Sequence, residues 1–146
     1  MARVASSNRR RQAADKMHSA AIHLLRRLRK QDVATGVGAA RLSALSVLVF
    51  GGPQSLRSLA RAEQVKPPTM SRIVEALEAE GLAQRSRDKK DGRAIRLRAT
   101  AKGVRVLQAG RQRRIEYFSG MLQKLGEKEL ATIARAAELL EKVVRA

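Results

Sequence analysis

The residues best suited to chemistry stand at the front of a predicted helix that begins near Pro67 and ends at Gly81. Their side chains face away from an apolar stripe that Ile73 and Leu77, flanked by Val74, form at helical spacing. Small hydroxyls and a guanidinium at the start of a second helix are suited to base edges and phosphates in the major groove of DNA. The candidates on this helix are Lys66, Pro68, Thr69, Ser71 and Arg72.

A second group of charged residues lies in a predicted β-hairpin directly behind that helix. Residues 82–87 and 94–99 each have the composition of a short strand, and Ile95 and Leu97 are expected to face inward because they alternate with arginines. A basic hairpin in this place is suited to contacts with phosphates or with the minor groove. The candidates on the hairpin are Arg85, Arg87, Lys89, Lys90, Asp91 and Arg93.

The turn of this hairpin has two interpretations. Asp91 and Gly92 could form a plain turn, with Asp91 bonding to the backbone and Gly92 supplying a positive φ. Alternatively, Arg93 enters the minor groove and Asp91 orients it through an ion pair. The position between two strands, behind a helix-turn-helix, favours the second interpretation.

Five further helices must position these groups, and the last two carry apolar residues at three- and four-residue spacing. These two expose more apolar surface than one chain can cover, so packing against a second copy is expected, with a monomeric bundle as the alternative. Residues 31–38 are expected to form a loop, and Ser55 an N-cap. The predicted helices are residues 13–30, 39–50, 56–63, 101–125 and 127–145.

The chain of 146 residues carries 31 Lys and Arg against 13 Asp and Glu, a formal net charge of +18. Attraction to a polyanion explains this charge, and nucleic acid is the commonest polyanion. A solvated surface rich in Arg for compositional reasons is the alternative. With one Tyr, two Phe and no Trp, the core must be aliphatic.

Several classes of site are not expected. Because the sequence has no Cys, it can form no disulfide, thiolate zinc site or thiol redox switch. His18 and His23 are five residues apart, which does not suit a pair of metal ligands on one helix face. We therefore predict no catalytic residue, no metal site and no cofactor. No secretory signal and no apolar run of the ~18 residues that a membrane span needs are found, so a cytoplasmic location is expected.

The pattern resembles the MarR family of bacterial transcription regulators over most of the chain, from about Lys16 onward. The resemblance implies a homodimer on a palindromic operator, with the helix from Pro67 in the major groove and the hairpin, or wing, in the minor groove. The residues that carry it are Leu59-Ala60, Pro68 to Val74, Leu77 to Leu82, Arg85, Asp88, Asp91 to Arg93, Leu97 to Thr100 and Gly103.

The implied fold class is mainly α (α+β): a winged helix-turn-helix with a three-helix dimerisation lobe from both chain ends. Residues 39–100 are then the DNA-binding lobe, and residues 13–38 and 101–146 the dimerisation lobe, of a single domain over residues 13–146. Residues 1–12 are expected to form a flexible basic arm, either a frayed terminus or an extra phosphate contact.

Two positions depart from the family pattern. Gln64 stands where many members have Gly in the turn, which costs about 1 kcal/mol if the residue is left-handed. Lys66 stands where many members have a Ser N-cap, so that a capping bond worth about 1 kcal/mol is missing. We hypothesise that Lys66 reaches a DNA phosphate instead.

The implied function is a sequence-specific regulator of transcription, a repressor released by a small amphipathic effector, often an anionic phenolic. By this resemblance His18, His23 and Phe50 are candidates to line the effector pocket, although ordinary packed or surface histidines are the simpler interpretation. The alternative function is a low-specificity, charge-driven protein that coats DNA. Enzymatic activity is not expected.

Overall fold

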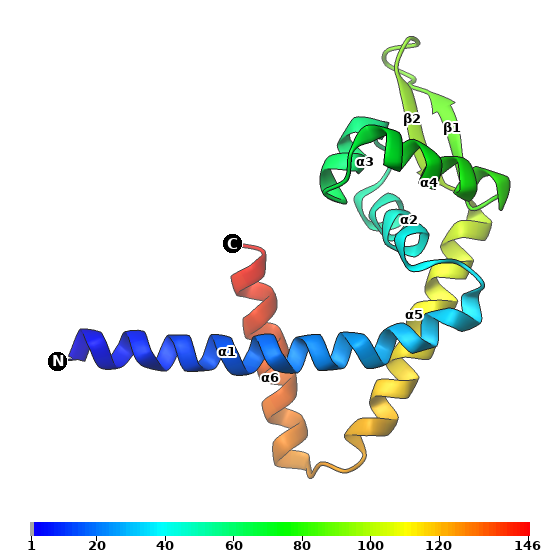
Figure 1. Ribbon diagram of the computed structural model, residues 1–146. Coiled ribbons are helices and arrows are strands. Elements are labelled where there is room, and N and C mark those ends of the chain that lie inside the picture. Colours follow the sequence, from blue (N-terminus) through cyan, green and yellow to red (C-terminus); the bar gives the residue numbers. More distant parts are fainter. Residues whose placement is uncertain (1) are drawn as a thin grey trace. The chain divides into compact units, whose positions relative to one another are not determined.

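The helices and strands follow the predicted order, with two strands among helices (Figure 1). The computed structural model describes residues 2–146, and Met1, the first residue of the predicted arm, lies outside them. The chain divides into two units, one up to Arg114 and one over Ile115–Ala146. The elements are α1 Ala2–Arg29, the 3-10 helix η1 Lys30–Thr35, α2 Ala39–Gly51, α3 Leu56–Ala62, α4 Pro67–Ala79, β1 Ala83–Arg87, β2 Ile95–Ala99, α5 Ala101–Leu122 and α6 Glu127–Val144.

Two boundaries near the N-terminus differ from the prediction. The first helix begins at Ala2 and not at Ala13, because residues 2–12 contain no Gly or Pro and include the good helix formers Ala, Arg and Gln. The predicted arm is therefore helical from Ala2. The predicted loop over residues 31–38 is mostly the helix η1, which ends at Gly36 with a φ of +70°.

The hydrophobic core is aliphatic, as predicted, and its buried residues lie between Val37 and Leu107. On α4 the buried face is Met70, Val74 and Leu77, whereas Ile73 is only half-buried. The buried face is therefore rotated by about one residue from the predicted one. Met70, Val74 and Leu77, at spacings of four and three, are the residues that face α2 and α3. The fully buried large side chains are Leu45, Leu59, Met70, Val74, Leu77, Leu82 and Leu97.

The hairpin pairs β1 and β2 antiparallel, from Ala83 opposite Ala99 to Arg87 opposite Ile95. The inward prediction is correct for Leu97, which is 2% exposed, and wrong for Ile95, which is 54% exposed. Both share one face, but Ile95 lies two residues nearer the free end, where the hairpin extends beyond the helices (Figure 1). Gln54 adds a single antiparallel bridge to Leu97.

The start of α5 packs closely on the chain that leaves α4. A Cβ at Gly103 would lie 2.1 Å from the backbone oxygen of Leu82, so only glycine fits there. The Gly103 N–H donates to Thr100 Oγ1 at 3.0 Å, and Thr100 Oγ1 donates to the Gly81 oxygen at 2.6 Å. These bonds attach α5 to the base of the hairpin.

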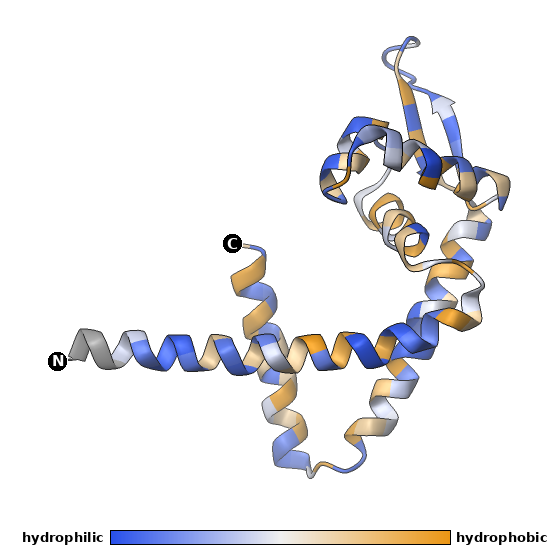
Figure 2. Ribbon diagram, in the orientation of Figure 1, coloured by the Kyte–Doolittle hydropathy of each residue, from blue (hydrophilic) through white to orange (hydrophobic). Residues whose placement is uncertain are grey.

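The unit Ile115–Ala146 has a different character, because α6 contains no buried residue. Figure 2 shows apolar residues recurring along α6 and along α1. Three large apolar residues of α1 are also exposed, namely Met17, Ile22 and Leu25. The exposed large apolar residues of the second unit are Ile115, Tyr117, Ile133, Leu139, Leu140, Val143 and Val144.

No single helix of the described residues is long and apolar enough to cross a membrane. One bent pair of helices, Ser6–Thr35 with Ala39–Gly51, has the length and the composition of a span, and nothing beyond these two properties supports it. Over residues 2–146, no three acidic or histidine side chains are grouped as a metal site would require.

Candidate nucleic-acid interface

The helix-turn-helix consists of α3 and α4, which pack on each other. Ser55 caps α3 as predicted, its Oγ accepting a 3.1 Å hydrogen bond from the N–H of Ser58. Gln64 has a φ of +55°, so the turn keeps a left-handed residue although this position is not Gly. The next residue closes the turn, because the N–H of Val65 donates to the oxygen of Ala60 at 3.0 Å.

The front of α4 presents side chains more than backbone donors. Lys66 is the N-cap and makes no capping hydrogen bond through its side chain, as predicted. Pro67 and Pro68 follow and have no N–H, so Thr69 is the first residue of the helix with one to offer. Most of the α4 candidates are exposed, namely Lys66, Pro68, Thr69 and Arg72.

Ser71 differs from its neighbours because it is half-buried and already bonded. Its Oγ donates to Glu75 Oε1 at 3.0 Å, one turn along α4. Arg72 forms no ion pair with any residue that the structure describes. Arg72 is the only Lys or Arg within α4, so its guanidinium is the one cationic group that this helix offers without an ion pair.

The hairpin turn is built around two aspartates. Asp88 accepts hydrogen bonds of 2.8 Å from the N–H of Lys90 and of 2.8 Å from Nε of Arg96. The bond from the Lys90 N–H, followed by that from Arg96, lowers the pKa of the Asp88 carboxyl. A carboxylate in this position closes the turn and holds the strand that follows it.

Asp91 accepts its hydrogen bond from the backbone N–H of Arg93, at 3.1 Å. No ion pair between Asp91 and the guanidinium of Arg93 is found in the described chain, so the predicted pair is wrong and the plain-turn interpretation is correct for Asp91. No sequence pattern distinguishes these two bonds, since a carboxylate two residues before a basic residue can accept from its backbone or its side chain. The positive φ predicted for Gly92 is wrong, because the glycines with a positive φ in the described residues are Gly36, Gly52 and Gly81.

The hairpin cations fall into two groups. Arg85 forms an ion pair of 3.1 Å with Glu78 of α4, and Arg96 one of 2.8 Å with Asp88. Arg85 thereby holds the hairpin against α4, and Arg96 holds the hairpin turn. Within residues 2–146, the exposed hairpin cations without an ion pair are Arg87, Lys89, Lys90, Arg93 and Arg98.

Charge alone does not single out this surface. Residues 39–100 hold 12 Lys and Arg against six Asp and Glu, or +6, and the remaining +12 of the total of +18 lies outside them. What distinguishes this lobe is the placement of unpaired cations on a helix start and a hairpin end that share one rigid core.

Sequence reasoning missed two exposed arginines on α3, Arg57 and Arg61. They lie four residues apart and so share one face of the helix. The first helix of a helix-turn-helix crosses the DNA backbone, which makes both candidates for phosphate contact. Their spacing directly before the turn is the signal that could have identified them.

The residues expected to line an effector pocket are all exposed. His18 and His23 lie on α1, and Phe50, near the end of α2, is 69% exposed. None of the three takes part in a hydrogen bond or ion pair among the described residues. Their pocket role stays a prediction.

Comparisons with known proteins agree on one family. A sequence model described as "MarR family" matches residues 39–95. The chain is 31% identical over 121 residues to an uncharacterized HTH-type transcriptional regulator, Mb0904, of Mycobacterium bovis, covering 83% of this chain and 85% of that protein.

Two solved structures show the same fold. The structure of a MarR family protein from Bacillus stearothermophilus has a TM-score of 0.80 at 20% identity, over 92% of this chain and 94% of that one. A mutant of S. aureus MepR bound to an oligodeoxyribonucleotide has a TM-score of 0.67 at 18% identity, over 90% of this chain and 97% of that one. The predicted class, mainly α with a winged helix-turn-helix, is confirmed.

Proposed function

Because this chain belongs to the MarR family of DNA-binding transcription regulators, we propose that it is a sequence-specific repressor that acts as a homodimer on an inverted repeat. In this proposal α4 is the recognition helix and enters the major groove, while the wing, β1 and β2 with their turn, contacts the minor groove. The observation that carries the proposal is the set of unpaired, exposed cations at the front of α4 and the end of the wing.

The proposal gives each group a role. Arg72 contacts a base edge or a phosphate, and Thr69, with its free N–H and hydroxyl, contacts a phosphate. Arg93 reaches into the minor groove, while Lys89 and Lys90 meet the phosphates beside it. Because Arg85 and Asp91 are bonded within the protein, they support the wing's shape.

The homodimer is supported by the uncovered apolar residues of α6. Ile133, Leu140 and Val144 share one helix face at a spacing of seven and four residues, and each is at least one-third exposed. A symmetric partner that covers this face would give the assembly two recognition helices related by a two-fold axis, which is the symmetry of an inverted repeat. Half-sites about one helical turn apart, ~34 Å, would then match the dimer.

The proposal includes regulation by a small amphipathic effector, such as an anionic phenolic. The effector would bind beside His18, His23 or Phe50 and favour a spacing of recognition helices that does not fit the operator. The protein would act in the bacterial cytoplasm, on the nucleoid.

A second candidate function is favoured by the net charge of +18. A protein that coats DNA through charge alone would bind any duplex and would lose its affinity steeply as salt rises.

Selection from a random duplex pool, at physiological salt and with excess competitor DNA, distinguishes the two functions. The proposal expects an enriched inverted repeat. No enrichment, with binding that disappears as salt rises, would reject it in favour of DNA coating.

The selected repeat then tests the interface. Arg72→Ala and Arg93→Ala should each weaken binding to the repeat, by about 5- to 150-fold if the lost contact is a bidentate base contact. Arg135→Ala on α6 removes the same charge outside the interface and is the matched control. Equal effects of all three would mean that only charge is being measured.

A further inference from the structure

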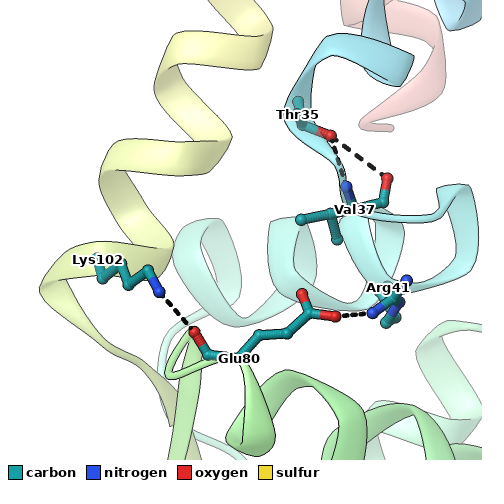
Figure 3. A network of polar contacts seen from close by, with 5 residues as sticks. All are labelled: Thr35, Val37, Arg41, Glu80 and Lys102. Atoms are coloured by element: carbon teal, nitrogen blue, oxygen red, sulfur yellow. Dashed lines mark hydrogen bonds and ion pairs between the residues drawn. The ribbon is translucent and has the colours of Figure 1, made fainter.

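The recognition helix α4 is closed by a residue that contacts two other helices (Figure 3). The carboxylate of Glu80, which caps α4, forms an ion pair with Arg41 in the first turn of α2. The backbone oxygen of Glu80 accepts a 2.8 Å hydrogen bond from Nζ of Lys102, in the first turn of α5. Cations from two helices therefore converge on the end of the helix that carries the DNA candidates.

The ion pair stands where each helix alone would disfavour it. A cation in the first turn of α2 and an anion at the end of α4 both oppose the helix macrodipole. Each charge of the Arg41–Glu80 pair is compensated by the other only when these two helix ends meet. The pair thus depends on the placement of α4 against α2 and not on either helix by itself.

Arg41 also lies over the junction that precedes α2, residues 35–38. A Cβ at Gly38, the N-cap of α2, would be 3.6 Å from Nη2 of Arg41. Beside it, Thr35 Oγ1 accepts a 3.1 Å hydrogen bond from the N–H of Val37, and Figure 3 shows this contact next to the ion pair.

The junction returns to α5 at a second point. A Cβ at Gly110 of α5 would lie 3.2 Å from Cγ2 of Thr35, so the Thr35 side chain lies close to the backbone of α5. Contacts therefore run from Gly110 through the junction and Arg41 to Glu80, and back to α5 at Lys102. These two points on α5 are eight residues apart, or about 12 Å along the helix. The closed path sets the end of α4 against α5.

From this path we infer that Arg41 and Glu80 are positioning residues, which hold the angle of the recognition helix for specific DNA binding without touching DNA. Glu80 follows the last turn of the 13-residue helix, about 12 Å along the axis from Arg72 and about 20 Å from Lys66. The side chains of Arg41 and Glu80 are 30% and 35% exposed, and a pair at that exposure adds little to stability. The inference rests on the proposed sequence-specific function.

Two variants with opposite charge changes separate positioning from electrostatics. Arg41→Gln lowers the net charge by one and Glu80→Gln raises it by one. Attraction alone would weaken DNA binding by the first and strengthen it by the second. Positioning requires both to weaken binding to the selected repeat, each by about two- to fivefold, the range for a pair of this exposure.

The double variant Arg41→Glu with Glu80→Arg keeps the net charge and should restore binding that either single reversal loses. Each protein is titrated with the selected repeat and with a scrambled duplex of equal length, and its thermal unfolding is recorded. The exposed pair Arg135–Glu138 of α6, with the same Gln substitutions, is the matched control.

The outcomes are distinct. Preferential loss on the repeat by both Gln variants, with unfolding temperatures within a degree or two of wild type, supports the inference. Opposite shifts on the repeat, or equal losses on both duplexes, overturn it and leave the proposed function intact. A wild-type protein that does not distinguish the duplexes overturns both.

Discussion

Lys66 shows how one residue can oppose folding and favour binding. It occupies the N-cap of α4 without a capping bond, directly before two prolines. The helix therefore begins with no side-chain acceptor at its first free N–H and with an ammonium group at the positive end of its dipole. Both effects disfavour the isolated helix, and a bound phosphate would offset them.

Lys66→Ser should accordingly stabilise the protein and weaken its binding. We expect a gain of about 1 kcal/mol in the free energy of unfolding, measured by urea titration. We also expect lower affinity for the selected repeat and a salt dependence reduced by about one per protomer. If affinity and salt dependence are both unchanged, Lys66 does not contact a phosphate.

Asp88 makes the wing sensitive to acid. Its folded pKa is lowered by the Lys90 N–H and by Arg96, so the stability from these bonds is fully present above the unfolded value of about 3.9 and is lost as pH falls through the folded pKa. In a carbon-detected NMR titration, the Asp88 carboxyl should therefore titrate below its ordinary range.

The companion variant Arg96→Gln should raise the Asp88 pKa only part of the way, because the bond from the Lys90 N–H remains. An ordinary pKa in the wild type would contradict the wing geometry. Full recovery in the variant would assign the whole shift to Arg96.

At the scale of elements, the packing of α5 against the residue before β1 depends on one glycine. Gly103→Ala would place Cβ 2.1 Å from the Leu82 oxygen, which is backbone and cannot rotate away. We expect a loss of at least about 1–3 kcal/mol in the free energy of unfolding. Gly120→Ala on the same helix, where nothing lies within 4 Å, is the control and should gain up to about 1 kcal/mol. Equal effects would mean that α5 is free to shift.

Local signals predicted the elements well where the chain itself supplies the signal. Ser55, Gln64 and Gly81 mark caps and turns that depend on a few neighbouring residues, and the structure has them as expected. Predictions failed where tertiary position decides. Ile95 has the alternation of an inward residue but lies beyond the helices that would cover it.

The candidate site was predictable only in part for the same reason. The sequence identifies the cations at the front of α4 and in the wing, but it does not pair them. That Arg85 contacts Glu78 and that Asp91 contacts a backbone N–H follow from the fold of the hairpin against α4. The Arg41–Glu80 pair joins residues 39 positions apart, and no local pattern could have suggested it.

At the scale of the whole molecule, assembly should depend on α6. Leu140→Glu places a charge in the exposed apolar face and should yield a monomer of 16.0 kDa in sedimentation experiments, where the wild type sediments as a dimer. Ala131→Glu introduces the same residue nine positions earlier, on the opposite side of the helix, and should remain dimeric. Dimers for both variants would place the interface elsewhere.

Tyr117 gives this molecule an internal optical label. It is the single Tyr of a chain without Trp, and it lies on α5 within the unit Ile115–Ala146 with 38% of its surface exposed. Ultraviolet fluorescence of the unmodified protein therefore originates almost entirely from that unit, because the helix-turn-helix and the wing contain no Tyr or Trp. A change in tyrosine emission during dilution would report subunit dissociation. A change on adding DNA would report that DNA binding to one unit alters the surroundings of Tyr117 in the other.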